Sequence, residues 1–209
     1  MPEKRSLEDR TLFRGVFLVA FATLLLELTV IRVLSFTIWY HFAYVVISTA
    51  LLGYAAAGSL LAVWPQVGRS NLGSTLARAC LLAGVTAVGV LLLLAWVPLH
   101  PMELSTVPSQ KWVFLLYQVA VTVPFFFSGF VVSLAMRTAA KHVDRLYFWD
   151  LVGGGFACVL AVALMNSLTP PGAVLLGAAA FVFAALVFSR RGSERVASLV
   201  VAAIILCGV

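Results

Sequence analysis

Seven long runs of apolar residues divide the chain, and they limit its possible folds more than any other feature. The charged residues fall almost entirely between the runs. A helix needs about 20 residues to cross the hydrocarbon core of a bilayer. Six runs are near this length or longer, and they are Leu12–Leu34, His41–Trp64, Leu76–Pro98, Trp112–Met136, Tyr147–Leu168 and Ala173–Ser189. The seventh starts at Val196 and reaches Val209 after only 14 residues, too few to cross.

The fold class follows from these runs. Hydrophobic residues make up 63% of the 209 and charged residues 11%, and the mean hydropathy is +1.08. Continuous rather than alternating apolar runs are typical of membrane helices. The sequence therefore predicts an all-α, polytopic bundle of about seven spans, the last one truncated or short. We expect residues 1–209 to form a single transmembrane domain, a fragment of a longer chain with no soluble catalytic domain within it.

The basic residues indicate the orientation of the bundle. Twelve of the 14 Lys and Arg residues precede or open the first run, or lie in or beside alternate loops, and only Arg32 and Lys111 lie on the opposite side. Because cytoplasmic loops carry an excess of Lys and Arg, we expect a cytoplasmic amino terminus. The net charge of +6 reflects this bias and some attraction to anionic lipid, so we expect the bilayer and not a nucleic acid as the partner.

No pattern for covalent chemistry is recognisable in the chain. Cys80, Cys158 and Cys207 fall within apolar runs, and the three histidines are scattered. The glycines at 153–155 follow no strand and lie within an apolar run, which argues against a nucleotide-binding loop. We therefore expect no catalytic residue, metal site or cofactor in this chain.

Small residues and one proline suggest how the helices pack. Small side chains let helix backbones approach closely, and we expect this role for Gly53, Ala57, Gly58, Gly84 and the stretch Gly153–Ala157. Pro124 removes a backbone hydrogen bond within the fourth run and predicts a helix kink.

Glu27 lies within the first apolar run. Counting from Phe13, it lies about 21 Å into a core about 30 Å thick, where an acid costs about 2.5 kcal/mol or more. We therefore expect it to face the bundle. Arg32 lies about 140° away around the helix and is a poor partner. His41, at the start of the second run, is better placed. A purely structural role and a functional role for Glu27 remain equally open.

Asp150 is the second acid within an apolar run, about one turn from the inner boundary at Tyr147. An acid in the first turn of a helix complements the helix dipole. Arg14, Arg137 and Lys141 lie at the same level and are candidate partners. We expect Asp150 and Glu27 to lie at different depths and not to act as a pair.

Several short stretches resemble the membrane domain of the membrane-fused spermidine synthase-like proteins of bacteria. The stretches are Glu27-Leu28 with Arg32, Trp39–Ala43, Ser48–Gly53 and Tyr147–Gly153. In that family a polytopic amino-terminal domain precedes an aminopropyltransferase domain that uses decarboxylated S-adenosylmethionine. The resemblance implies a bacterial inner membrane, a connection to polyamines and a downstream aminopropyltransferase-like domain as a partner.

The catalytic part of that family is not present in these 209 residues, so we expect this chain by itself to transfer no aminopropyl group. Because the cofactor is made in the cytosol, a longer parent would need an even number of crossings before its catalytic domain. Two other functions stay open: an accessory subunit packed against other membrane subunits, and a transporter of a small solute or polyamine.

Overall fold

The computed structural model describes residues 2–37, 42–68, 71–103 and 107–189, together with Ser198 and Val201. Within them, every element is helical, as predicted. The helices are α1 (Pro2–Thr37), α2 (Phe42–Val63), α3 (Leu72–Trp96), η1 (Pro101–Glu103), α4 (Pro108–Thr138), η2 (Ala140–His142), α5 (Val143–Ser167) and α6 (Pro170–Phe188). Six of the described helices are long and apolar enough to cross a membrane. The predicted seventh run lies outside the described residues except for Ser198 and Val201, both helical.

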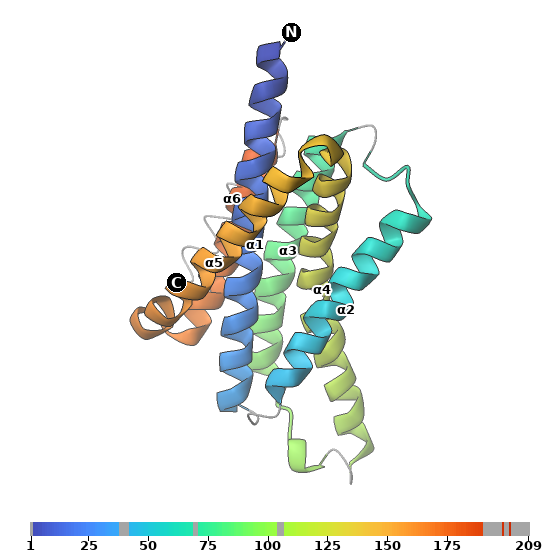
Figure 1. The fold of residues 1–209 in the computed structure, drawn as a ribbon. Helices are drawn as coiled ribbons and strands as arrows, with labels where there is room; N and C mark the ends of the chain where they lie inside the picture. Colours follow the sequence, from blue (N-terminus) through green and yellow to red (C-terminus); the bar gives the residue numbers. More distant parts are fainter. Residues whose placement is uncertain are drawn as a thin grey trace.

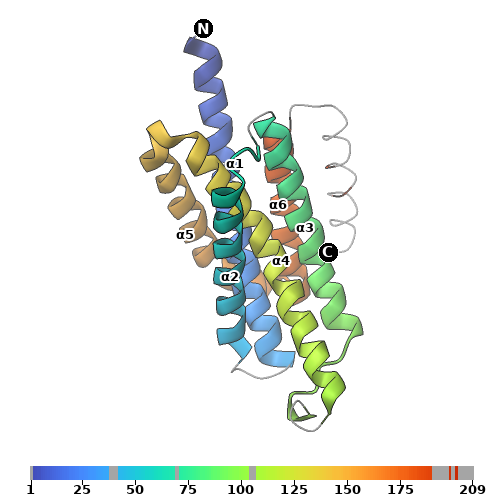
Figure 2. The ribbon, with the colours of Figure 1, turned by 90° about the vertical axis from the view of Figure 1, so that its right-hand side faces the viewer.

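The long helices form an up-and-down bundle in which the amino-terminal end of α1 projects beyond the others (Figures 1 and 2). Helix α1 packs mainly against α5 and α6, α3 packs against α6 and α4, and α2 packs against α4. Contact between α1 and α2 is slight. Helix α6 is therefore central and α5 is peripheral: 67% of the most apolar part of α6 is buried, compared with 22% for α5.

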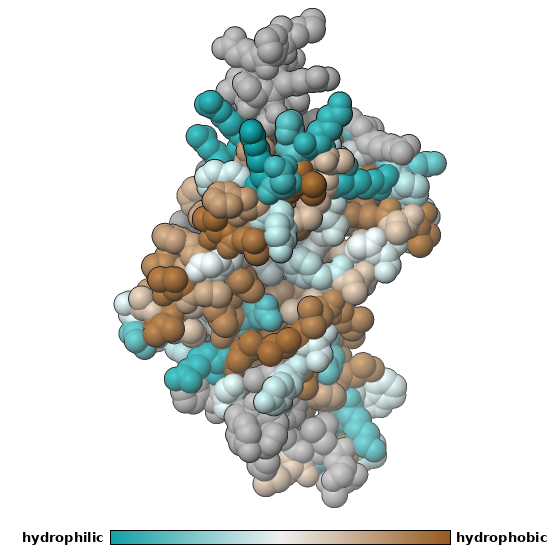
Figure 3. Space-filling view, in the orientation of Figure 1, coloured by the Kyte–Doolittle hydropathy of each residue, from teal (hydrophilic) through white to brown (hydrophobic). Residues whose placement is uncertain are grey.

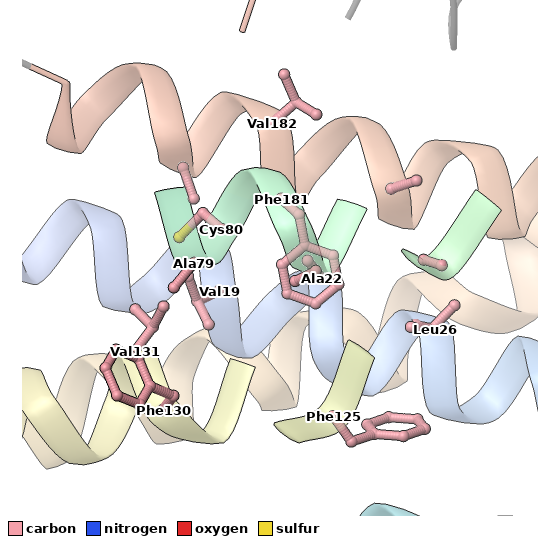
Figure 4. Packing of buried hydrophobic residues seen from close by; sticks show 14 of the residues in the cluster. Val19, Ala22, Leu26, Ala79, Cys80, Phe125, Phe130, Val131, Phe181 and Val182 are labelled. Carbon is pink, nitrogen blue, oxygen red and sulfur yellow. The ribbon is translucent and has the colours of Figure 1, made fainter. Parts of the chain in front are cut away.

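The main core lies where α1, α3, α4 and α6 meet. Figure 4 shows Val19 and Leu26 from α1, Cys80 from α3, Phe125 from α4 and Phe181 from α6 in this core. Helices with apolar side chains on all sides have no single buried stripe. Exposed apolar side chains, such as Leu51 of α2 and Val159 of α5, cover the outside of these two helices.

Two glycines allow the closest helix contacts. A Cβ at Gly53 of α2 would lie 2.7 Å from the backbone nitrogen of Phe126 and 2.9 Å from the carbonyl oxygen of Thr122, both on α4. A Cβ at Gly153 of α5 would collide with the carbonyl oxygen of Phe17 on α1. Such contacts between backbones are possible only where the side chain is absent. Helix α2 is therefore held against α4, and α5 against α1.

Helix α4 remains a single helix on both sides of Pro124, which is buried. The predicted kink stays a prediction.

Near the end of α4, Arg137 donates hydrogen bonds to the carbonyl oxygens of Leu61 (3.2 Å) and Pro65 (2.7 Å) at the end of α2. Arg137 thus satisfies carbonyl groups that a helix end leaves unpaired. The sequence suggested Arg137 as a partner of Asp150, but the structure places its guanidinium on α2.

Candidate functional site

A cavity of about 520 Å³ lies between α1, α2 and α5. This volume is within the usual range for sites that bind small molecules, about 300–1,000 Å³. Its wall is formed by Ala20, Thr23, Leu24 and Glu27 of α1, Ile47, Ala50, Leu51 and Tyr54 of α2, and Asp150, Leu151, Gly154 and Gly155 of α5.

The close helix contacts explain why this space exists. The contact at Gly53 draws α2 toward α4, and the contact at Gly153 draws α5 toward α1. Within the described residues, α2 and α5 make almost no contact with each other. A gap therefore remains between them, and α1 forms its inner wall.

The helical repeat places the lining residues on matching faces. Residues three and four apart share one face of a helix, which accounts for Ala20, Thr23 and Glu27 on α1 and for Asp150 and Gly154 on α5. On α2, Ala50 and Tyr54 are related in the same way. Each of the three helices thus presents at least one small residue and at least one polar residue to the cavity.

Both intramembrane acids line this one cavity. Sharing a cavity does not place the two acids at one depth, so their expected difference in depth stays a prediction. Helix α5 begins at Val143 and runs obliquely across α1 (Figure 1). Both side chains are partly buried, and neither forms a hydrogen bond or an ion pair with another residue that the structure describes.

Three hydroxyl groups extend the polar wall inward. The side chains of Thr23 and Ser128 lie close to the Tyr54 hydroxyl. Thr23 Oγ1 donates to the carbonyl oxygen of Val19 (2.7 Å), and Ser128 Oγ donates to that of Phe125 (3.1 Å). Because both of these hydroxyls already donate their proton, the single proton of the Tyr54 hydroxyl can be accepted by one of them at a time.

The other residues singled out in the sequence lie elsewhere. Arg32 is exposed near the end of α1 and does not line the cavity. His41, proposed as a partner of Glu27, lies outside the described residues. Thr23 and Tyr54 were missed, although their spacing from Glu27 and from Ala50 could have indicated them.

The arrangement favours binding of a positively charged group. Two acids that lack charged partners among the described residues face a mainly apolar cavity that no described basic side chain lines. Across the described part of the chain, no three His, Cys, Asp or Glu residues are grouped so that they could hold a metal ion.

Comparison of the chain with protein-family models, with curated proteins and with solved structures finds no match.

Proposed function

We propose that the chain is an integral membrane domain that binds the ammonium group of an organic amine in the cavity between α1, α2 and α5. The observation that carries this proposal is the position of Glu27 and Asp150, from different helices, on the wall of one cavity. A buried charge is costly unless it is paired and hydrogen-bonded. A protonated amine supplies both a positive charge and hydrogen-bond donors, which an acid on this wall lacks among the described residues.

The resemblance to spermidine synthase-like proteins supports an amine as the ligand. Its two most specific parts, residues 27–53 and 147–153, are far apart in the sequence. They contribute Glu27, Ile47, Ala50, Leu51, Asp150 and Leu151 to the cavity wall. This juxtaposition favours amine binding over the purely structural role of an accessory subunit, which requires apolar helix faces but no acids.

We further propose that the domain lies in a bacterial inner membrane with a cytoplasmic amino terminus, and that the run from Val196 begins a seventh span. Arg10, Arg14, Arg137, Lys141 and Arg145 support this orientation, because all lie toward the end of the bundle where α1 begins. Hydrophilic side chains gather at that end in Figure 3. An aminopropyltransferase-like domain remains the proposed downstream partner.

Amine binding is tested by measuring the unfolding free energy of the protein in lipid nanodiscs. Spermidine and butylamine are the probes, and butanol is the uncharged control. A ligand that binds only the folded state adds about 2.7 kcal/mol at 100 times its dissociation constant. We expect both amines to stabilise the protein and butanol to have no effect.

The matched variant is Glu27→Gln combined with Asp150→Asn, which keeps the shape of the cavity and removes both charges. A hydrogen bond to a charged group contributes about 1.5–3 kcal/mol, so amine affinity should fall by about tenfold or more. The proposal fails if neither amine stabilises the protein, or if the double variant responds to the amines as the wild type does.

A further inference from the structure

The cavity has an inner polar wall and an outer apolar rim. On α2, Ala50 is buried, whereas Ile47 and Leu51 are 41% and 67% exposed. On α5, Gly154 is buried, whereas Leu151 is 54% exposed. The acids are partly buried, and four residues with apolar or no side chains surround the mouth: Ile47, Leu51, Leu151 and Gly155.

The mouth lies within the apolar spans. Leu51 is well inside the span Tyr44–Val63, and Leu151 and Gly155 lie about one and two turns inside the apolar run that begins at Tyr147. Within the described residues, α2 and α5 hardly touch, so no helix contact closes the mouth between them. In Figure 3, which shows this side of the bundle, hydrophilic atoms are visible within the hydrophobic middle band.

This polarity pattern matches a molecule with a charged head and an apolar chain. A small water-soluble amine has to leave water to reach the mouth, so it should bind more weakly than an amphiphilic amine with the same head group. An amphiphilic amine already lies in the bilayer and needs only to move sideways. Its chain would replace the lipid contacts of the rim residues, and its head would reach the acids.

We propose that the ligand of the cavity is a long-chain primary amine that enters from the bilayer through the gap between α2 and α5. Its ammonium group lies against the acidic wall of the cavity, and its hydrocarbon chain passes between Leu51 and Leu151. This inference rests on the proposed function, because it requires that the cavity binds amines. It adds the class of amine and the route of entry.

The chain offers a variant that narrows the mouth and a matched control. A Cβ at Gly155 meets no other atom within 4 Å, so Gly155→Leu extends a side chain at the rim without a clash at Cβ. A Cβ at Gly58 on α2 also meets nothing within 4 Å, and Gly58 does not line the cavity. Gly155→Leu and Gly58→Leu therefore make the same chemical change inside and outside the mouth.

The probe is dodecylamine with a photoreactive diazirine midway along its chain, added to the protein in nanodiscs. Cross-linked residues are identified by mass spectrometry. We expect cross-links to the α2 and α5 segments around Leu51 and Leu151, displaced by unlabelled dodecylamine but not by dodecanol. Cross-linking should be lost in Glu27→Gln/Asp150→Asn and in Gly155→Leu, and it should persist in Gly58→Leu.

The outcomes separate this inference from the proposed function. If butylamine and spermidine bind but dodecylamine does not label the rim, lateral entry of a long-chain amine is wrong and amine binding stands. Lateral entry is also wrong, and amine binding stands, if Gly155→Leu leaves labelling unchanged or if the rim residues cross-link to a second copy of the chain. If none of the three amines binds, both proposals are wrong.

Discussion

At the scale of single residues, Glu27 carries a large free-energy cost of insertion into the membrane. An acid near the centre of a membrane helix costs about 2.5–3.5 kcal/mol on insertion scales. The structure gives Glu27 no side-chain partner among the described residues, so no observed contact offsets this cost. Folding stability alone therefore does not explain the acid, whereas the proposed binding of a cation would.

We predict that Glu27→Gln stabilises the ligand-free protein by about 1 kcal/mol, because a neutral amide is easier to bury than a carboxylate. The control is Asp144→Asn at the exposed start of α5. There an acid complements the helix dipole, and its loss should cost about 0.3–1 kcal/mol. Unfolding free energies in nanodiscs without amine measure both effects. Destabilisation by Glu27→Gln would show that Glu27 has a structural partner.

At the scale of helices, the consecutive glycines of α5 lie in three different surroundings. Gly153 faces the backbone of α1 at Phe17, and Gly154 faces the side chain of Leu24. Gly155 lies at the mouth of the cavity, where an added Cβ meets nothing within 4 Å. The order of the glycines along the helix therefore determines which of them holds α5 in place and which leaves space.

We predict that Gly153→Ala destabilises the protein by about 1–3 kcal/mol, because the new methyl group forces α5 away from α1. Gly155→Ala makes the same change two residues later and should be neutral, or stabilising by up to about 1 kcal/mol, since alanine favours the helix. Unfolding free energies distinguish the two variants. Equal effects at both positions would contradict the close contact between α1 and α5.

At the scale of the whole molecule, the distribution of charge sets the orientation. The described basic residues at the end of the bundle where α1 begins include Arg10, Arg14, Arg137, Lys141 and Arg145. Arg32 and Lys111 lie toward the opposite end. Because an excess of Lys and Arg marks the cytoplasmic side, the connection between α3 and α4 should face outward.

We predict that a membrane-impermeant maleimide labels Met102→Cys in intact cells but labels Gln66→Cys only after permeabilisation. Both positions are exposed, Met102 between α3 and α4 and Gln66 between α2 and α3. The three native cysteines are first replaced, so that each variant carries a single thiol. The reverse pattern of labelling would overturn the orientation.

The positions of the six described membrane helices could be predicted from the sequence, because about 20 consecutive apolar residues must satisfy their backbone groups within the helix. Their ends could be predicted less well. Helix α4 begins at Pro108 rather than Trp112, and α5 begins at Val143 rather than Tyr147. Hydropathy marks only the part within hydrocarbon, whereas the helices continue into the polar interface.

The sequence alone also determined that Glu27 and Asp150 are the two acids within apolar runs. Only the tertiary structure decided that they share a cavity. Their separation depends on the tilt of α5 across α1 and on the distance between α2 and α5. Backbone contacts at Gly53 and Gly153 set both quantities. Each contact depends on how a small residue on one helix matches the surface of another, and hydropathy along a single helix carries no information about that match.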